Sequence, residues 1–267
     1  MKAKNTITLS AAILVALTST AFAGKGNDGL SMIVPPQAHY GGKTHAEWVQ
    51  AYWQWAVSIP GAAEDFPWVN DGPSFELNQA GPVFFLGATG NWSDQIPPGT
   101  SVADALASYE PEQRSATVPA GKALFVEIDG YSHFKNTLGG ETLEYWNADA
   151  VSVVESFEPI NFILEIDGQM VPIDTSSDSP YFVSTVVSSL AVPPGSAFPY
   201  WLFGSPAAFE TWAGGDVIPY IFDAGMSFLI KPLPVGEHAV RVRTFDAWYG
   251  YAYSELSAVD WHVTVTP

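Results

Sequence analysis

The most regular pattern of apolar and polar positions lies near the start of the chain, in THAEWVQAYWQWAVSIP, residues 44–60. Apolar side chains recur there at the three- and four-residue spacing of an α-helix. Thr44 and Glu47 form a T-x-x-E capping box, and Pro60 cannot continue a helix. We therefore expect a helix that Thr44 opens and Pro60 closes.

Aromatic residues cover a wide part of this helix. Its apolar side chains span about 200° of arc, about twice what a surface helix needs. One arc of about 60° holds Trp48, Tyr52 and Trp55. The polar residues beside it are Glu47, Gln50 and Gln54. Two interpretations remain open: the aromatic side chains belong to a core, or they line a binding site with this polar rim.

Strand patterns dominate the rest of the chain. The apolar run Val83–Leu86 is framed by glycines, and Ala123–Ile128 follows a Pro-Ala-Gly turn. Asp167-Gly168 separates two apolar runs, which is a strong hairpin signal. A further helix is expected at Ala148–Phe157, with a strand as the alternative because of its valines. Many short strands with Pro/Gly turns favour a mostly β fold, an antiparallel immunoglobulin-like or jelly-roll sandwich with helices inserted mainly in the N-terminal half.

The first 23 residues carry the pattern of a secretory signal peptide. Lys2 and Lys4 give a positive start, AAILVAL is a short apolar segment, and AFA is a cleavage signal before Gly24. The apolar segment is far shorter than the about 20 residues that span a bilayer. We expect residues 24–267 to form a single β-sandwich domain with helical decorations. The mature protein should be periplasmic or extracellular, with no membrane insertion after cleavage.

Charge and cysteine content narrow the expected partners. The chain has 28 Asp and Glu against 10 Lys and Arg, a formal net charge of −18, and no cysteine. Nucleic acid is not an expected partner, because phosphate binding needs a basic surface. Stability must come from packing rather than disulfides. The excess of acidic residues indicates a solvated surface, and calcium binding is the alternative. No other cofactor is expected.

The segment PLPVGEHAVRVRTFDAW (Pro232–Trp248) resembles a P-x-G-x-H/Y-x-V-x-V hairpin that recurs in immunoglobulin-like sandwiches of exported proteins. The order of motifs is also similar to that of a broader group of exported microbial proteins of unassigned function. The shared motifs are the Trp-rich helix (Trp48–Trp55), Gln79–Gly87, Val118–Lys122, Ile166–Val171 and Pro232–His238. The resemblance implies a sandwich fold and export, and it brings no established catalytic residues with it.

The strongest acidic cluster is EIDGYSH, which contains Glu127, Asp129 and His133. Glu127 and Asp129 are two residues apart, so a regular strand points both to one side. Two carboxylates and a histidine at a strand end could hold calcium or perform general acid–base chemistry. The alternative is that Glu127 faces solvent and Asp129 makes an Asp-Gly turn.

A second aromatic group lies in AWYGYAYSE, where Tyr249, Tyr251 and Tyr253 share one face if the segment is extended. Aromatic rings stack on the faces of sugars, and amides and carboxylates bind sugar hydroxyls. The sequence contains none of the common catalytic motifs. We therefore expect an exported binding protein that recognises carbohydrate or another extracellular polymer.

Two other functions fit the same sequence. The first is a polysaccharide-active hydrolase or lyase that uses carboxylates such as Glu47, Glu127 and Asp129. The second is a structural cell-surface or matrix protein. Titratable groups that converge in a cleft would favour the enzyme, and an exposed aromatic strip would favour the binding protein. A free sheet edge or a broad apolar patch would favour the structural protein.

Overall fold

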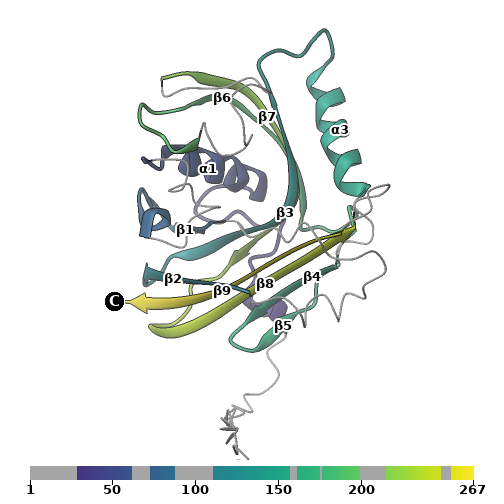
Figure 1. Ribbon diagram of the computed structural model, residues 1–267. Coiled ribbons are helices and arrows are strands. Elements are labelled where there is room, and N and C mark those ends of the chain that lie inside the picture. Colours follow the sequence, from purple (N-terminus) through teal and green to yellow (C-terminus); the bar gives the residue numbers. More distant parts are fainter. Residues whose placement is uncertain are drawn as a thin grey trace, which may run out of the picture.

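The chain folds into two sheets in a sandwich-like arrangement, with its helices mainly in the N-terminal half (Figure 1). The predicted mostly β fold is thus confirmed. The structure is a computed structural model that describes residues 29–61, 73–87, 111–156, 161–174, 176–198, 215–247 and 254–267. The expected signal peptide lies outside these residues.

Each sheet has its own strand order. The first sheet contains, in order, β1 (Val83–Leu86), β3 (Ala123–Lys135), β7 (Val217–Ile230) and β6 (Phe182–Ala191). The second contains β2 (Glu112–Pro119), β9 (Ser254–Thr266), β8 (Gly236–Ala247), β4 (Asn161–Ile166) and β5 (Gln169–Val171). Most neighbours are antiparallel, but β1 runs parallel to β3 and β2 runs parallel to β9, so both sheets are mixed.

The chain changes sheets between β2 and β3. The turn after Pro119 is held to both sheets, since Ala120 N donates to Thr266 O (2.7 Å) and Ala123 N donates to Pro82 O (2.9 Å). Consecutive strands therefore do not pair with each other here. The Pro-Ala-Gly signal predicts the turn but not this change of sheet.

The first helix, α1 (His45–Ser58), packs on the first sheet and has the predicted capping box. Glu47 N donates to Thr44 Oγ1 (3.2 Å), and Thr44 N donates to Glu47 Oε2 (2.7 Å). Ile59 is extended, so the helix ends just before Pro60. The described N-terminal part also contains two short 3₁₀ helices, η1 (Gly29–Met32) and η3 (Pro73–Glu76).

The second long helix, α3 (Leu143–Glu155), begins earlier than the predicted Ala148. Thr142 explains the difference, because its Oγ1 accepts a hydrogen bond from Tyr145 N (3.1 Å) and caps the helix. Ala150 and Val154 are buried against Phe222 of β7. Figure 1 shows α1 and α3 on opposite sides of β3 and β7.

Strand β3 extends beyond the predicted end at Ile128, and the Asp-Gly pair at 129–130 does not turn. Gly130 allows the strand to continue, because a Cβ there would lie 2.8 Å from Ala224 O of β7. The Asp-Gly pair at 167–168, in contrast, forms the predicted hairpin between β4 and β5. Asp167 and Gly168 have φ angles of 50° and 77°, as a tight primed turn requires.

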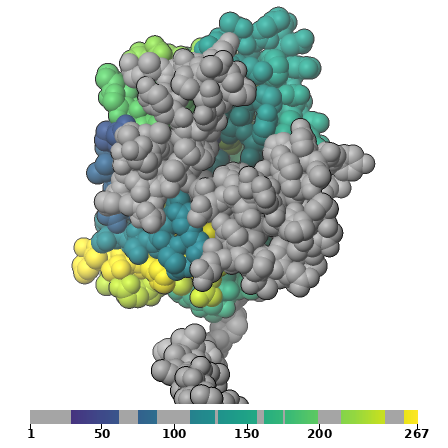
Figure 2. Space-filling model, in the orientation of Figure 1, coloured from purple at the N-terminus to yellow at the C-terminus, as the bar shows by residue number. Residues whose placement is uncertain are grey.

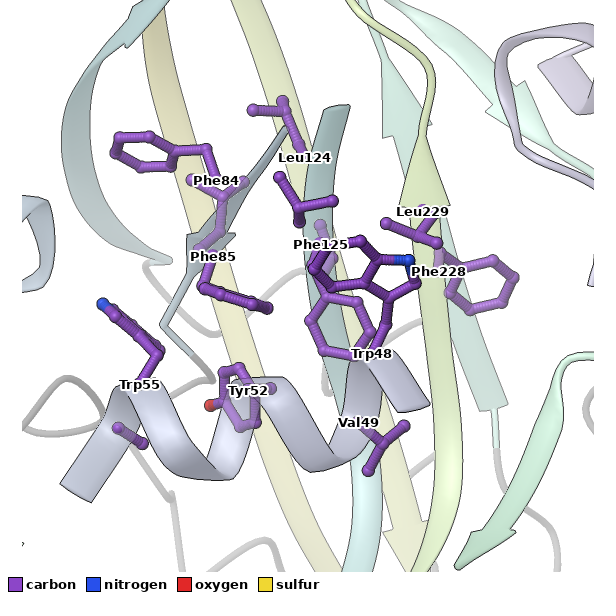
Figure 3. Packing of buried hydrophobic residues seen from close by; sticks show 14 of the residues in the cluster. Trp48, Val49, Tyr52, Trp55, Phe84, Phe85, Leu124, Phe125, Phe228 and Leu229 are labelled. Atoms are coloured by element: carbon purple, nitrogen blue, oxygen red, sulfur yellow. The ribbon is translucent and has the colours of Figure 1, made fainter. Parts of the chain in front are cut away.

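Aromatic side chains of α1 form the core over β1 and β3 (Figure 3). The ring of Trp55 stacks on Phe85 at 5.4 Å between centroids, and Tyr52 lies 5.4 Å from Phe125. On the other side of the first sheet, Phe228 stacks on Phe162 of β4 at 5.5 Å. Alternation along β8 buries Val240 and Val242 in the sandwich, as the sequence pattern predicts.

Candidate functional site

The carboxylate of Glu47 is part of the helix cap. Its Oε2 accepts hydrogen bonds from both the backbone N–H and the hydroxyl of Thr44, at 2.7 and 2.9 Å. The backbone bond is the main reason that the pKa of Glu47 is lowered. Glu47 is exposed, and these bonds account for its position without any ligand.

The tryptophans of α1 belong to the core. Trp48 and Trp55 are each 4% exposed, and Trp53 is fully buried. The indole N–H groups of Trp48 and Trp55 donate to Tyr40 O (2.9 Å) and Leu77 O (3.0 Å). The helix therefore presents neither of these rings as an accessible platform, and the core interpretation holds for them.

The two glutamines of α1 point in different directions. Gln54 is exposed, whereas the amide of Gln50 is partly buried against β6. Gln50 Nε2 donates to Thr185 Oγ1 (3.1 Å) and to Val186 O (3.2 Å). The predicted polar rim is therefore divided, because one glutamine ties the helix to the sheet and the other faces outward.

A buried carboxylate that the sequence analysis missed lies under α1. Asp223 of β7 is 4% exposed, and its Oδ2 accepts from Trp53 Nε1 (2.7 Å) and Ser132 Oγ (2.8 Å). Burial raises the pKa of Asp223 to about 6, although the bonds from Trp53 and Ser132 lower it. Asp223 is the single charged residue in the apolar run VIPYIFDAGMSFLI, and this signal could have identified it.

A buried histidine lies on the same side of the first sheet. His45 Nε2 is 2.9 Å from Ser227 Oγ, and burial lowers the pKa of His45 to about 4. The ring is therefore neutral at pH 7. His45 and Asp223 are titratable, but their burial and hydrogen bonds make them parts of the contact between α1 and the sheet.

The expected acidic cluster is not assembled as the sequence pattern suggests. Glu127 lies opposite Ser227 and Asp129 lies opposite Met226, with a bulge between them. Ser227 and Met226 are consecutive, so the backbone register shifts between the two acidic positions and the regular strand spacing assumed for them does not hold. The side chain of Asp129 lies outside the described part of the structure.

His133 lies on the face that α3 covers. It is opposite Phe222 on β7, and its Nε2 is 3.2 Å from Asp149 Oδ2 of α3. Burial lowers the pKa of His133, although Asp149 acts in the opposite direction. The partner of His133 is thus a carboxylate of α3, whereas Glu127 faces the other way, toward the Ser227 side of the sheet.

Several aromatic and polar side chains meet where α3 crosses β3. We call them the α3–β3 cluster: Tyr131, His133, Lys135, Tyr145, Trp146 and Asp149. Lys135 Nζ lies 3.7 Å from the centre of the Trp146 ring, a cation–π contact. Tyr145 is 50% exposed and meets Trp146 edge-on at 5.2 Å. Figure 2 shows α3, in teal, at the surface of the molecule.

Unused hydrogen-bonding capacity is concentrated on the same face of the first sheet. Three buried polar atoms have no hydrogen-bond partner within the described chain: His133 Nε2, Asn147 Oδ1 and Ser184 Oγ. The contact of His133 with Asp149 is close, but it lacks the alignment of a hydrogen bond. Asn147 belongs to α3, and Ser184 is opposite Ala224, which packs against α3. Buried polar atoms are normally paired, so these three atoms distinguish this face as a candidate region.

A histidine of the PLPVGEH segment joins two turns at one end of the second sheet. His238 Nδ1 lies 2.7 Å from Asp167 Oδ2, and its Nε2 lies 2.8 Å from Pro234 O. Both partners are acceptors, so the doubly protonated ring satisfies both contacts. Partial burial opposes this form, but the bonds to Asp167 and Pro234 raise the pKa of His238.

Two of the predicted binding residues, Tyr249 and Tyr251, lie outside the described residues. Within the described ranges, no group of three or more His, Asp or Glu side chains is arranged to hold a metal ion. No helix in the same ranges is both long and apolar enough to cross a membrane.

Comparison with known proteins adds no family to this description. No protein-family model matches the chain, and no curated protein is similar to it at a significant level. The resemblance to exported microbial proteins therefore stays a prediction, and the functional argument rests on the residues themselves.

Proposed function

We propose that this protein is an exported binding protein that recognises carbohydrate, or another extracellular polymer, through the α3–β3 cluster. The observation that carries the proposal is that aromatic rings and polar atoms lie together on one face of the first sheet. Partly exposed aromatic rings lie there beside buried polar atoms whose hydrogen-bonding capacity is unused.

Sugars have both kinds of surface that such a site can contact. Their C–H faces stack on aromatic rings, and their hydroxyls donate and accept hydrogen bonds. Tyr145 is the exposed ring of the cluster, and its free face can contact one face of a sugar unit. The partly exposed carboxylate of Asp149 in the same cluster can accept hydrogen bonds from sugar hydroxyls. A net charge of −18 disfavours a polyanion, so a neutral polymer is the preferred class.

Export is supported by the sequence. Lys2 and Lys4, the apolar AAILVAL segment and the AFA signal have the order and lengths of a cleavable signal peptide. A location outside the cytoplasm would bring the mature protein into contact with wall and extracellular polymers. N-terminal sequencing of the protein from its source cell should give Gly24, and an intact Met1 would contradict export.

Binding can be tested with soluble neutral and acidic polysaccharides in affinity electrophoresis, followed by calorimetry on the ligands that retard the protein. Tyr145→Ala should weaken binding at least about tenfold, or ~1.4 kcal/mol, because it removes the exposed ring. Met170→Ala is the matched control, since Met170 is exposed to a similar degree on the second sheet. Binding that Tyr145→Ala leaves unchanged, or retardation by no polysaccharide of the series, would refute the proposal.

A further inference from the structure

The two long helices are attached to the first sheet in different ways. α1 buries eight of its 14 residues, and the apolar ones belong to the large core that also includes residues of β1 and β3. α3 buries only Ala150 and Val154 of its 13 residues. With Phe222 and Ala224 of β7, these two form a small cluster that is separate from the large core. The large core can therefore persist when the contacts of α3 are lost.

Hydrogen bonds increase this difference between the helices. Three side chains of α1 are hydrogen-bonded to β6 or β7. In the described chain, no side chain of α3 makes a hydrogen bond to β3, β6 or β7, and those that bond elsewhere reach Leu138 and Ser177, outside the sheet. α3 is thus held by a narrow apolar contact, by the approach of Asp149 to His133 and by one cation–π contact.

The contact of α3 with the sheet also carries a free-energy penalty. Three buried polar atoms near α3 have no hydrogen-bond partner in the described chain: Asn147 Oδ1 of α3, and His133 Nε2 and Ser184 Oγ of the sheet. Burial of a polar atom without a partner costs free energy, and exposure to water would pair it. Separation of α3 from the sheet therefore recovers part of the free energy that is lost with the apolar contacts.

We propose that α3 is a displaceable cover, which leaves the first sheet as a unit while α1 and both sheets stay folded. An isolated helix of 13 residues is marginal in water, so α3 unwinds when it leaves. Tyr145 and Asp149 belong to α3, whereas His133 and Lys135 belong to β3, so the α3–β3 cluster is complete only in the closed form. Control of ligand binding by this motion rests on the proposed function, whereas the motion itself does not.

The motion is tested by hydrogen exchange of the unchanged protein, followed by mass spectrometry in the absence of any ligand. After correction for intrinsic rates, the interior amides of α3 should exchange at least about tenfold faster than those of α1, because a local opening exposes them. Urea below the unfolding transition should hardly change the exchange of α3 but should accelerate that of α1, since the local opening exposes less surface. Equal protection of the two helices, or an equal dependence on urea, would overturn the proposal.

A pair of serine variants tests whether the unpaired atoms favour the opening. Ser184→Ala removes a buried hydroxyl that has no partner in the described chain, so it should slow the exchange of α3 at least about threefold. Ser188→Ala is the matched control, because Ser188 is an exposed serine of the same strand, and it should leave the exchange unchanged. Exchange of α3 that Ser184→Ala does not slow, or that both variants slow equally, would count against the proposal.

The measurement keeps the motion separate from the function of the cluster. A protein that binds polysaccharide while α3 is as protected as α1 would overturn the motion and leave the proposed function standing. A protein whose α3 opens as expected but which binds no polysaccharide would support the motion and overturn the proposed function.

Discussion

The buried carboxyl of Asp223 makes a specific prediction about stability and pH. Its pKa is raised from 3.8 to about 6 by burial beneath Trp53. Between these two values the unfolded chain has lost the proton while the folded protein still holds it. The folded state is therefore favoured at low pH, and this contribution is lost as the pH rises through about 6. A difference of about 2 pH units at ~1.36 kcal/mol each gives a loss on the order of 3 kcal/mol.

Asp223→Asn isolates this contribution. The amide oxygen can still accept hydrogen bonds from Trp53 and Ser132, but the side chain no longer titrates. The free energy of unfolding of the variant, minus that of the unchanged protein, should therefore rise by ~3 kcal/mol between pH 4 and pH 7. Urea unfolding followed by tryptophan fluorescence at pH 4, 5, 6 and 7 measures this difference directly.

His45 makes the comparison with the variant necessary. Its pKa is lowered from 6.5 to about 4, so its neutral form contributes stability that is lost as the pH falls through this range. In the unchanged protein the effects of His45 and Asp223 oppose each other between about pH 4 and pH 6, which flattens the measured curve. His45 is present in both proteins, so its contribution cancels in the difference. A difference that stays constant with pH, or that falls as the pH rises, would refute the reasoning.

Three other changes test separate parts of the structure. His238→Gln should lower the free energy of unfolding more at pH 5 than at pH 8. The raised pKa of His238 means that its contribution is present below pH 6.5 and is lost at higher pH. Equal losses at the two pH values in urea unfolding would contradict the bonded imidazolium. Trp55→Ala should destabilise the protein by ~3–5 kcal/mol while Gln54→Ala changes little, and similar unfolding midpoints for both variants would show that the ring is not core. Gly130→Ala should cost ~1–3 kcal/mol, since its Cβ meets the backbone oxygen of Ala224; an unchanged melting temperature would argue against the close approach of β3 and β7.

Features set by neighbouring residues could be predicted from the sequence. The capping box at Thr44 and the hairpin at Asp167-Gly168 both form, because each depends on side chains and φ angles within a few positions. The alternation that buries Val240 and Val242 is also local. These elements are sufficient to identify a mostly β sandwich, since apolar spacing determines which face of a strand is buried.

Features that depend on distant partners could not be predicted in the same way. The pattern EIDG is compatible with a turn, yet Gly130 continues the strand because β7 lies against it. The bulge between Glu127 and Asp129 then changes which face the later residues occupy, so His133 lies on the face that α3 covers and Glu127 on the other. Likewise, Lys135 and Trp146 meet only because α3 crosses β3, and no local spacing brings them together.

The polar side chains of α1 show why an aromatic helix with a polar border does not by itself identify a binding site. Close packing holds a helix against a sheet, and a buried hydrogen bond adds a directional constraint because it is lost when its partners separate. Three side chains of α1 make such bonds to the first sheet: His45 with Ser227, Gln50 with Thr185 and Val186, and Trp53 with Asp223. They lie at successive turns of the helix and reach two strands, β7 and β6. The polar groups thus fix the position of the aromatic core on the sheet, whereas the buried polar atoms near α3 that lack a hydrogen-bond partner in the described chain lie on the opposite face.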